Sequence, residues 1–341
     1  MTPLDITDLS RAALRDWLLD HGELPYRSEQ IFKWIYGGGL SDFGAMANLP
    51  RPLRTLLDQT FAVGVLTPSA RRVAVDGTRK LLFRLDGGAR VESVIIPEGG
   101  RLTVCVSSQA GCAMGCRFCA TARMGLVRDL RAGEIIGQVR AAQVEIHPDP
   151  VTNIVFMGMG EPLANYDAVY TALEILTAPW GLGFSPRRVT VSTVGLVPGI
   201  ERLVAESRVN VAVSLAATTD VVRTRLIPVN RRYPLGVLLE ACRRLPLPRR
   251  KRLFFEYVLL GGVNDGDADA RRLIDLLRGI PSKVNLLAFN PFPLAGFTPS
   301  PRQRVLRFQS ILREGGLQTN LRESRGGDIQ AACGQLAAEA A

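Results

Sequence analysis

Apolar runs alternate with amphipathic stretches over the last two thirds of the chain. Each run is short and rich in valine, leucine or phenylalanine, and the stretch after it has apolar positions at helical spacing. Six such pairs in succession predict parallel strands joined by helices. The expected strands are 102–108, 152–158, 188–193, 210–215, 254–260 and 283–290, and the expected helices are 130–146, 165–178, 199–207, 235–245, 267–279 and 301–315.

The first 98 residues follow a different pattern. Helices are expected at 9–21, 27–37 and 50–61, and β-rich runs then fill 71–98, broken by the turn-forming pairs Asp76-Gly77 and Asp86-Gly87. We therefore predict a small α+β N-terminal domain over 1–98 and an α/β core over 99–322. We interpret the core as a partial (βα)6 TIM-like barrel, although an open doubly wound sheet would give the same alternation.

Charge adds one further indication. The formal net charge is +10, and arginine pairs recur along the chain, as in Arg187-Arg188 and Arg243-Arg244. Such a surface suits a polyanionic partner, but arginines on ordinary solvated faces would give the same count. No run of 18 apolar residues and no leader-like start is present, so we expect a cytoplasmic protein without a membrane partner.

Small polar residues gather where the expected strands end. Glycine-, serine- or asparagine-containing segments follow five of the six strands directly. In parallel α/β folds these ends meet at one rim, where ligands bind. We interpret the rim as a cofactor site, formed by the segments 107–125, 158–162, 192–195, 214–217 and 290–293.

Three cysteines in the first of these segments carry the most specific chemistry. Cys112, Cys116 and Cys119 have C-x3-C-x2-C spacing. Three thiolates can hold three irons of a [4Fe–4S] cluster and leave the fourth iron open. A structural zinc site would need a fourth ligand, for which Cys105 is the near candidate, and a redox disulfide would use only two of the thiols. Cys242 lies at helical spacing among leucines and is expected in the core.

This loop, placed after the first strand of a βα series, resembles the radical S-adenosylmethionine (SAM) superfamily. That resemblance implies that the open iron binds SAM, whose reductive cleavage gives a 5′-deoxyadenosyl radical. Motifs along nearly the whole chain resemble more narrowly the RlmN/Cfr family of radical SAM RNA methyltransferases. They include "YRSEQIFKWIY", "VESVIIPE", "CVSSQAGCAMGCRFCATARMG", "FMGMGEPLANYD", "VSTVGLVPGI", "IPVNRRYP" and "RGGDIQAACGQLA".

The resemblance implies roles for three further residues. Cys333, in a C-terminal segment 323–341, corresponds to the cysteine that is methylated by one SAM and then delivers its methyl carbon to adenine. Cys105 corresponds to the thiol that releases the product by forming a disulfide with Cys333. Glu92 corresponds to an active-site carboxylate, and either it or Cys105 is expected to take the proton of the adenine carbon.

The resemblance also implies which residues contact SAM, all at the strand-end rim. One position departs from the family pattern, because Ala216 stands where a histidine is usual, and this removes a polar group that could touch the cofactor. The implied SAM residues are Gly160, Glu161, Ser192, Ser214, Leu215, Ala216 and Asn290.

The implied reaction is methylation of C2 of an adenine in 23S rRNA, and of adenine 37 in tRNAs, by an enzyme that uses two SAM molecules. A flavodoxin or ferredoxin would supply electrons, residues 1–98 would help to bind RNA, and DNA is not an expected partner. Three alternatives stay open: methylation of C8 as in Cfr, a non-enzymatic zinc-stabilised RNA-binding protein, and a degenerate paralogue that keeps the cluster.

Overall fold

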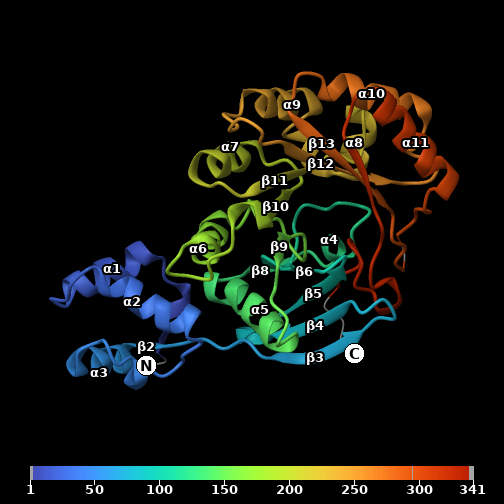
Figure 1. Ribbon diagram of the computed structural model, residues 1–341. Coiled ribbons are helices and arrows are strands. Elements are labelled where there is room, and N and C mark those ends of the chain that lie inside the picture. Colours follow the sequence, from blue (N-terminus) through green and yellow to red (C-terminus); the bar gives the residue numbers. More distant parts are fainter. Residues whose placement is uncertain (1–2, 294, 338–341) are drawn as a thin grey trace.

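The computed structural model describes residues 3–293 and 295–337, and its largest element is a ten-stranded sheet (Figure 1). Seven neighbouring strands are parallel, in the order β14-β13-β12-β11-β10-β9-β6. The predicted domains 1–98 and 323–341 include residues 1–2 and 338–341, which lie outside the described residues. The parallel strands are β6 (Arg101–Cys105), β9 (Asn153–Phe156), β10 (Val189–Thr193), β11 (Asn210–Ser214), β12 (Leu253–Leu259), β13 (Ser282–Ala288) and β14 (Thr319–Arg322).

Helices follow these strands and pack along one side of the curved sheet (Figure 1). Several begin where the sequence favours a start: Pro198 lies in the first turn of α7, and Pro301 immediately precedes α11. The predicted α/β partial barrel is therefore confirmed, with helices close to the expected ranges. These helices are α5 (Ala132–Glu145), α6 (Tyr166–Thr177), α7 (Val197–Glu206), α9 (Leu235–Arg244), α10 (Asp267–Leu277) and α11 (Arg302–Glu314), with the short α8 (Asp220–Leu226) after β11.

Three antiparallel strands extend the same sheet beyond β6. They are β3 (Pro68–Val73), β4 (Arg79–Arg84) and β5 (Arg90–Glu98), and β5 pairs with β6 in antiparallel register. The β-rich part of residues 1–98 thus shares the sheet of the core. On the opposite edge β14, a parallel strand beyond the six that we expected, pairs with β13.

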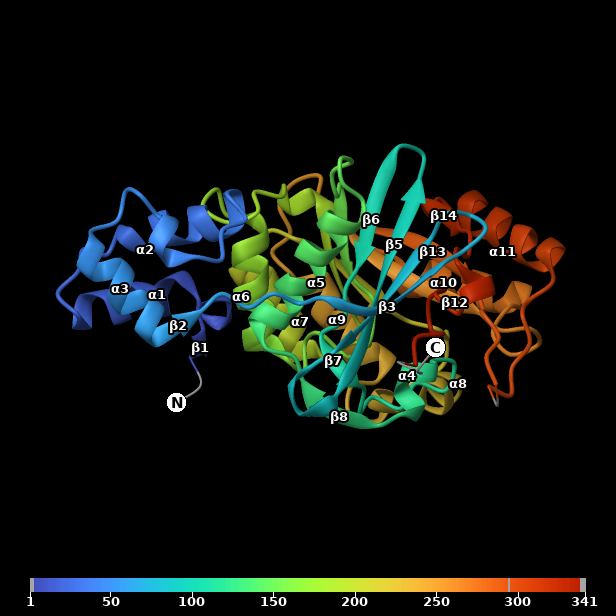
Figure 2. The ribbon, with the colours of Figure 1, turned by 90° about the horizontal axis from the view of Figure 1, so that it is seen from below.

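The N-terminal helices lie to one side of the sheet, beside α6 (Figure 2). They are α1 (Arg11–Asp20), α2 (Arg27–Phe32), which continues into a π-helical turn, and α3 (Arg51–Thr60). The Phe32 ring stacks on Trp180 with 5.3 Å between centroids, and the amide of Gly133 in α5 donates to Asp8 Oδ1 at 2.9 Å. Two short strands, β1 (Leu4–Asp5) and β2 (Phe61–Ala62), close this unit.

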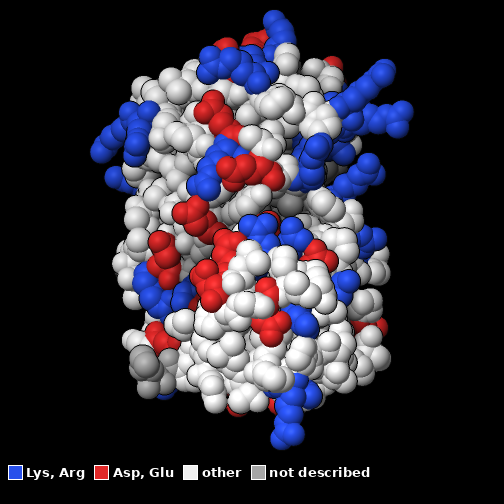
Figure 3. Space-filling view, turned by 90° about the vertical axis from the view of Figure 1, so that its left-hand side faces the viewer, with Lys and Arg blue, Asp and Glu red and all other residues white. Residues whose placement is uncertain are grey.

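Charge is unevenly spread over the face that carries this unit. Acidic side chains gather across its middle, and basic side chains project around its upper part (Figure 3). The high arginine content is therefore not a uniform basic coat there. Among the described residues, no helix has the length and apolar composition needed to cross a bilayer.

Candidate active site at the strand ends

The three-cysteine segment is a loop between a small hairpin and a short helix. The hairpin pairs β7 (Gln109–Gly111) with β8 (Leu126–Asp129), and α4 (Ala120–Arg123) begins directly after Cys119. The amide of Cys112 donates to the carbonyl of Gly125 at 2.8 Å. Gly111 has φ +77°, and a Cβ at that position would lie 1.9 Å from the same carbonyl oxygen. Only glycine therefore allows the hairpin to close on the loop.

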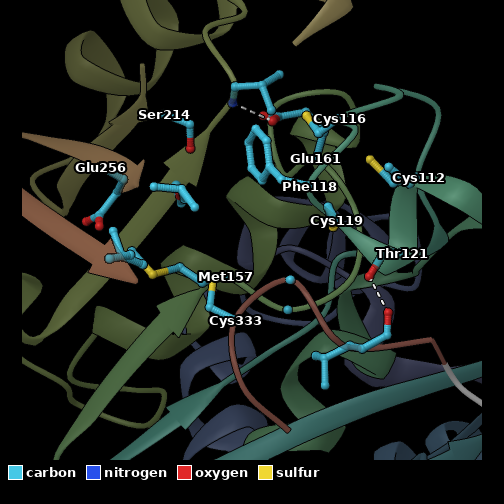
Figure 4. Close-up of a pocket in the computed structure, with 18 of the residues that line it drawn as sticks. Cys112, Cys116, Phe118, Cys119, Thr121, Met157, Glu161, Ser214, Glu256 and Cys333 are labelled. Atoms are coloured by element: carbon cyan, nitrogen blue, oxygen red, sulfur yellow. Dashed lines mark hydrogen bonds between the residues drawn. The ribbon is translucent and has the colours of Figure 1, made fainter. Parts of the chain in front are cut away.

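The three thiols face one pocket at the end of the parallel strands (Figure 4). Cys112 and Cys116 are buried and Cys119 is half-buried, and all three are free thiols. Burial raises the pKa of Cys112 to about 11 and that of Cys116 well above its usual value, and the neighbouring thiols raise both further. Thiols that influence one another in this way lie close together, and a bound metal cation would favour their deprotonated form.

The thiols are not arranged around a single point. In the described part of the chain, no group of three histidine, cysteine or acidic residues could hold one metal ion. Each thiolate of a [4Fe–4S] cluster binds a different iron atom, so a cluster needs no such common point. Cys105, the candidate fourth zinc ligand, does not line this pocket at all.

The segment after β9 supplies the next wall of the pocket. A Cβ at Gly158 would lie 2.7 Å from the carbonyl oxygen of Val106, and one at Gly160 would lie 2.5 Å from Gln109 Cβ. The buried Glu161 carboxylate accepts hydrogen bonds from the amides of Leu163 and Val194, at 3.1 and 2.8 Å. Burial raises the pKa of Glu161 to about 7, although these hydrogen bonds act to lower it. Two glycines and a buried carboxylate thus hold the backbone close to the pocket.

The predicted SAM residues divide into two groups. Ser192, Ser214 and Asn290 line the pocket, together with Gly160 and Glu161. Leu215 and Ala216 are not in its lining and are buried behind the rim. Ala216 has φ +53°, and its carbonyl accepts a hydrogen bond from Asn264 Nδ2 at 2.7 Å. The family's usual histidine is thus replaced by alanine at a buried position, where the backbone carbonyl makes the hydrogen bond to Asn264.

Cys333 reaches the same pocket from the C-terminal segment, more than 200 residues after the cysteine loop. The amide of Ala120 donates to the carbonyl of Gly334 at 2.7 Å, and Thr121 Oγ1 donates to the carbonyl of Leu336 at 2.6 Å (Figure 4). Asn290 Nδ2 donates to the carbonyl of Cys333 itself at 3.0 Å. These bonds fix Cys333 beside α4 and the end of β13.

Cys333 also lines a second cavity, which contains Cys105. Cys105 is buried at the end of β6, while Cys333 is exposed to the space that the two cavities share. Enclosure by the surrounding protein raises the pKa of both thiols to about 12, and the proximity of Cys333 contributes to the shift of Cys105. The two sulfurs therefore belong to one site.

Glu92 lines neither cavity. Its carboxylate, on β5, is 2% exposed and forms an ion pair with Lys80 on β4, with 2.9 Å between Nζ and Oε1. Lys80 Nζ also donates to the carbonyl of Gln330 at 3.2 Å, and Glu92 Oε2 accepts from the amide of Ala337 at 3.1 Å. This pair consequently holds the C-terminal segment on both sides of Cys333.

Family models match both parts of the chain. The model of the ribosomal RNA large subunit methyltransferase N-terminal domain matches residues 4–63, and that of the Radical SAM superfamily matches residues 106–274. A dual-specificity RNA methyltransferase RlmN of Geobacter sulfurreducens is 52% identical over 335 residues, covering 98% of this chain and 92% of that protein. The chain belongs to the RlmN family of radical SAM methyltransferases.

Further relatives agree with this assignment to the RlmN family. A protein of the same name from Syntrophobacter fumaroxidans is 47% identical over 340 residues, 99% of each chain. The crystal structure of a radical SAM methyltransferase from Sphaerobacter thermophilus is 48% identical, with a TM-score of 0.90 over 99% of this chain and 100% of that one. The predictions of a radical SAM fold and of an RNA methyltransferase are confirmed.

RlmN-family enzymes use a [4Fe–4S] cluster and SAM, as the sequence predicted. One observation that does not involve the cysteines indicates that the pocket suits these ligands. Glu256, on β12, lies on the opposite side of the pocket from the three thiols (Figure 4). Its Oε1 accepts from Asn285 Nδ2 at 2.8 Å, whereas its buried Oε2 has no hydrogen-bond partner among the residues that the structure describes. An orphaned acceptor inside a pocket is satisfied when a ligand supplies a donor.

Sequence reasoning missed two residues of this RlmN-family site. Glu256 is a charged residue inside the apolar run 254–260, and that mismatch was the available signal. Arg223, in α8, is fully buried, and burial lowers its pKa to about 10. Its guanidinium donates to the carbonyls of Val194 and Ser214, at 2.7 and 3.1 Å. Arg223 therefore ties together the ends of β10 and β11, which no local motif indicated.

Proposed function

We propose that this enzyme methylates C2 of an adenine in 23S rRNA and of adenine 37 in tRNAs, with Cys333 as the methyl carrier. The observation that carries the proposal is the position of Cys333 in the lining of both cavities. One cavity contains the three-cysteine loop, and the other contains Cys105. The names of the relatives, dual-specificity RNA methyltransferases, support RNA as the substrate class.

Cys112, Cys116 and Cys119 would hold the cluster, and Gly160, Glu161, Ser192, Ser214 and Asn290 would bind SAM. When bound, the cluster and SAM supply a 5′-deoxyadenosyl radical. Glu256 Oε2 would accept a hydrogen bond from SAM because it is the unpartnered acceptor of this pocket. Leu215 and Ala216 would support the rim through their backbone, since the carbonyl of Leu215 accepts from Arg223 Nε at 3.1 Å.

Cys333 would carry a methyl group on its sulfur and present it to the target adenine. Asn290 holds the Cys333 backbone, and the amide of Ala120 holds the adjacent residue, Gly334. Adenine C2 is electron-poor and resists polar methylation, so a carbon radical on the Cys333 methyl group is the suitable reagent. The target base would have to leave its stack to reach the Cys333 sulfur inside this site.

Cys105 would resolve the covalent enzyme–RNA adduct by forming a disulfide with Cys333. Its sulfur is in the lining of the cavity that Cys333 shares, and such exchange is ordinary thiol chemistry. Cys105 is also the better placed of the two candidate proton acceptors, because Glu92 is engaged by Lys80 outside both cavities. Glu92 would instead position the segment that bears Cys333.

The partners and location follow from this chemistry. RNA would contact residues 1–98 and the arginine clusters, which position the substrate through its phosphates, and residues 323–341 would form the carrier segment. A flavodoxin or ferredoxin would supply electrons, and neither membrane nor DNA would be needed. A reducing cytoplasm suits an enzyme whose described cysteines are all free thiols.

Nucleoside mass spectrometry tests the proposal. The reconstituted enzyme is incubated without oxygen with 23S rRNA fragments or tRNA, SAM and a reductant, and the RNA is digested. We expect 2-methyladenosine; 8-methyladenosine instead would establish the Cfr-type reaction, and neither product would indicate a degenerate paralogue. Cys333→Ala should abolish the product, whereas the matched Cys242→Ala, which removes a buried thiol outside both cavities, should retain it.

A further inference from the structure

A groove with three arginines lies on the outer side of the cysteine loop. Arg117 comes from the loop itself, Arg123 from the end of α4 and Arg225 from α8. No acidic residue is among its described lining residues. The uncharged part of the lining consists of Gly115, Cys116, Ala122, Val263, Ala295, Gly296 and Phe297.

The cysteine loop and α4 lie between this groove and the pocket that the three thiols line. Cys116 and Ala122 belong to the lining of both. The amide of Arg117 donates to the carbonyl of Leu226 at 3.0 Å, which holds the loop against α8. The groove is therefore an outer surface directly behind a predicted cluster ligand.

The arginines make the lining of this groove basic. All three side chains are exposed. Arg117 and Arg225 form no ion pair with any described residue, and the Arg123 guanidinium lies 5.5 Å from the centre of the Phe292 ring. Exposed charges of one sign in a concave surface attract a partner of the opposite sign and raise its association rate.

We propose that this groove docks the acidic protein that donates electrons to the enzyme. The inference rests on the proposed function, which requires an external reductant. One electron leaves the carrier, which is oxidised, and enters the enzyme, which is reduced, without any bond being formed or broken. A surface backed by Cys116 brings the carrier close to the cluster loop, and small, electrostatically guided interfaces are typical of electron-transfer partners.

RNA is the competing occupant, and the geometry favours the electron carrier. The RNA base must reach Cys333, and the cavity that holds Cys333 and Cys105 shares no residue with the groove, whereas the pocket of the three thiols meets the groove at Cys116 and Ala122. Two partners can consequently engage the enzyme from separate surfaces.

The test measures the affinity of the cluster-loaded, full-length enzyme for a reduced bacterial flavodoxin, by titration at low and high salt. Arg225→Glu should weaken binding at least about tenfold, and the salt dependence should decrease. Arg244→Glu is the matched control, because Arg244 is an exposed arginine at the end of α9, close to the start of β12 on the opposite rim. Flavodoxin binding that is unchanged in Arg225→Glu, or equally weakened in the control, would overturn the proposal.

A second readout separates docking from chemistry. Arg225→Glu should lose RNA methylation driven by flavodoxin but keep methylation driven by dithionite, and its RNA affinity should be unchanged. Loss of RNA affinity would assign the groove to the substrate instead. If the proposed function itself were wrong, wild-type enzyme would form no 2-methyladenosine with either reductant, while its flavodoxin affinity could still be measured.

Discussion

The buried ion pair between Lys80 and Glu92 gives a prediction that links stability to the placement of Cys333. The change is Lys80→Met, which keeps the length of the side chain but removes the charge. The two side chains are 8% and 2% exposed, so the pair is shielded from solvent. Removing one partner of a buried pair costs about 3–5 kcal/mol, a large part of the stability of an ordinary domain.

The measurement is urea unfolding, with Lys33→Met as the control at an exposed position. The control should change the free energy of unfolding by less than about 0.5 kcal/mol. The double variant Lys80→Met/Glu92→Leu should recover part of the loss, because no buried carboxylate then lacks its counter-charge. Equal stability of Lys80→Met and Lys33→Met would refute the reasoning.

A second assay on the same variant follows the C-terminal segment. Lys80 contacts the carbonyl of Gln330, and its partner Glu92 contacts the amide of Ala337. Lys80→Met should therefore release the segment and increase the rate at which iodoacetamide alkylates Cys333. An unchanged alkylation rate would show that the pair does not position the carrier cysteine.

Three other substitutions test the pocket wall. Glu256→Gln should weaken SAM binding about tenfold, since a charged acceptor for a ligand donor is lost; unchanged affinity in a SAM titration would count against its role. Gly160→Ala should lower the free energy of unfolding by at least about 2 kcal/mol, because φ is +101° and the new Cβ would clash with Gln109. A wild-type free energy of unfolding in urea would contradict the tight packing of Gly160 against Gln109. Arg223→Met should cost about 3 kcal/mol in the same assay, since buried carbonyls lose their donors; the exposed Arg244→Met should not.

The sequence predicted the fold well where the pattern is local. The six parallel strands and their helices follow from apolar runs and helical spacing, and they are present near the expected ranges. β14 was not predicted, because its four residues, Thr319–Arg322, are mostly polar and it pairs with only one neighbour. The pairing of β5 with β6, which joins the hairpin strands to the core, did have a local signal that we did not use: Gly99-Gly100, with φ +53° and +75°, forms the two-residue turn between Glu98 and Arg101.

The candidate site shows the same division. The three-cysteine loop and the glycines around Gly160 are contiguous motifs whose chemistry follows from residue type and spacing. The charge of Glu256 inside an apolar run was a local signal, but its orphaned oxygen is a property of the assembled pocket. The sequence also gave no reason to pair Lys80 with Glu92, or Arg223 with the carbonyls of two strand ends.

The central claim is that Cys333 carries the methyl group, and peptide mass spectrometry of the enzyme tests it most directly. The enzyme is incubated with SAM in the absence of RNA and digested, and each cysteine-containing peptide is examined for an added methyl group. The account predicts one methyl group on Cys333 and none on Cys105 or Cys242. An unmodified Cys333 in a preparation that still methylates RNA, or a methyl group on another cysteine, would contradict it.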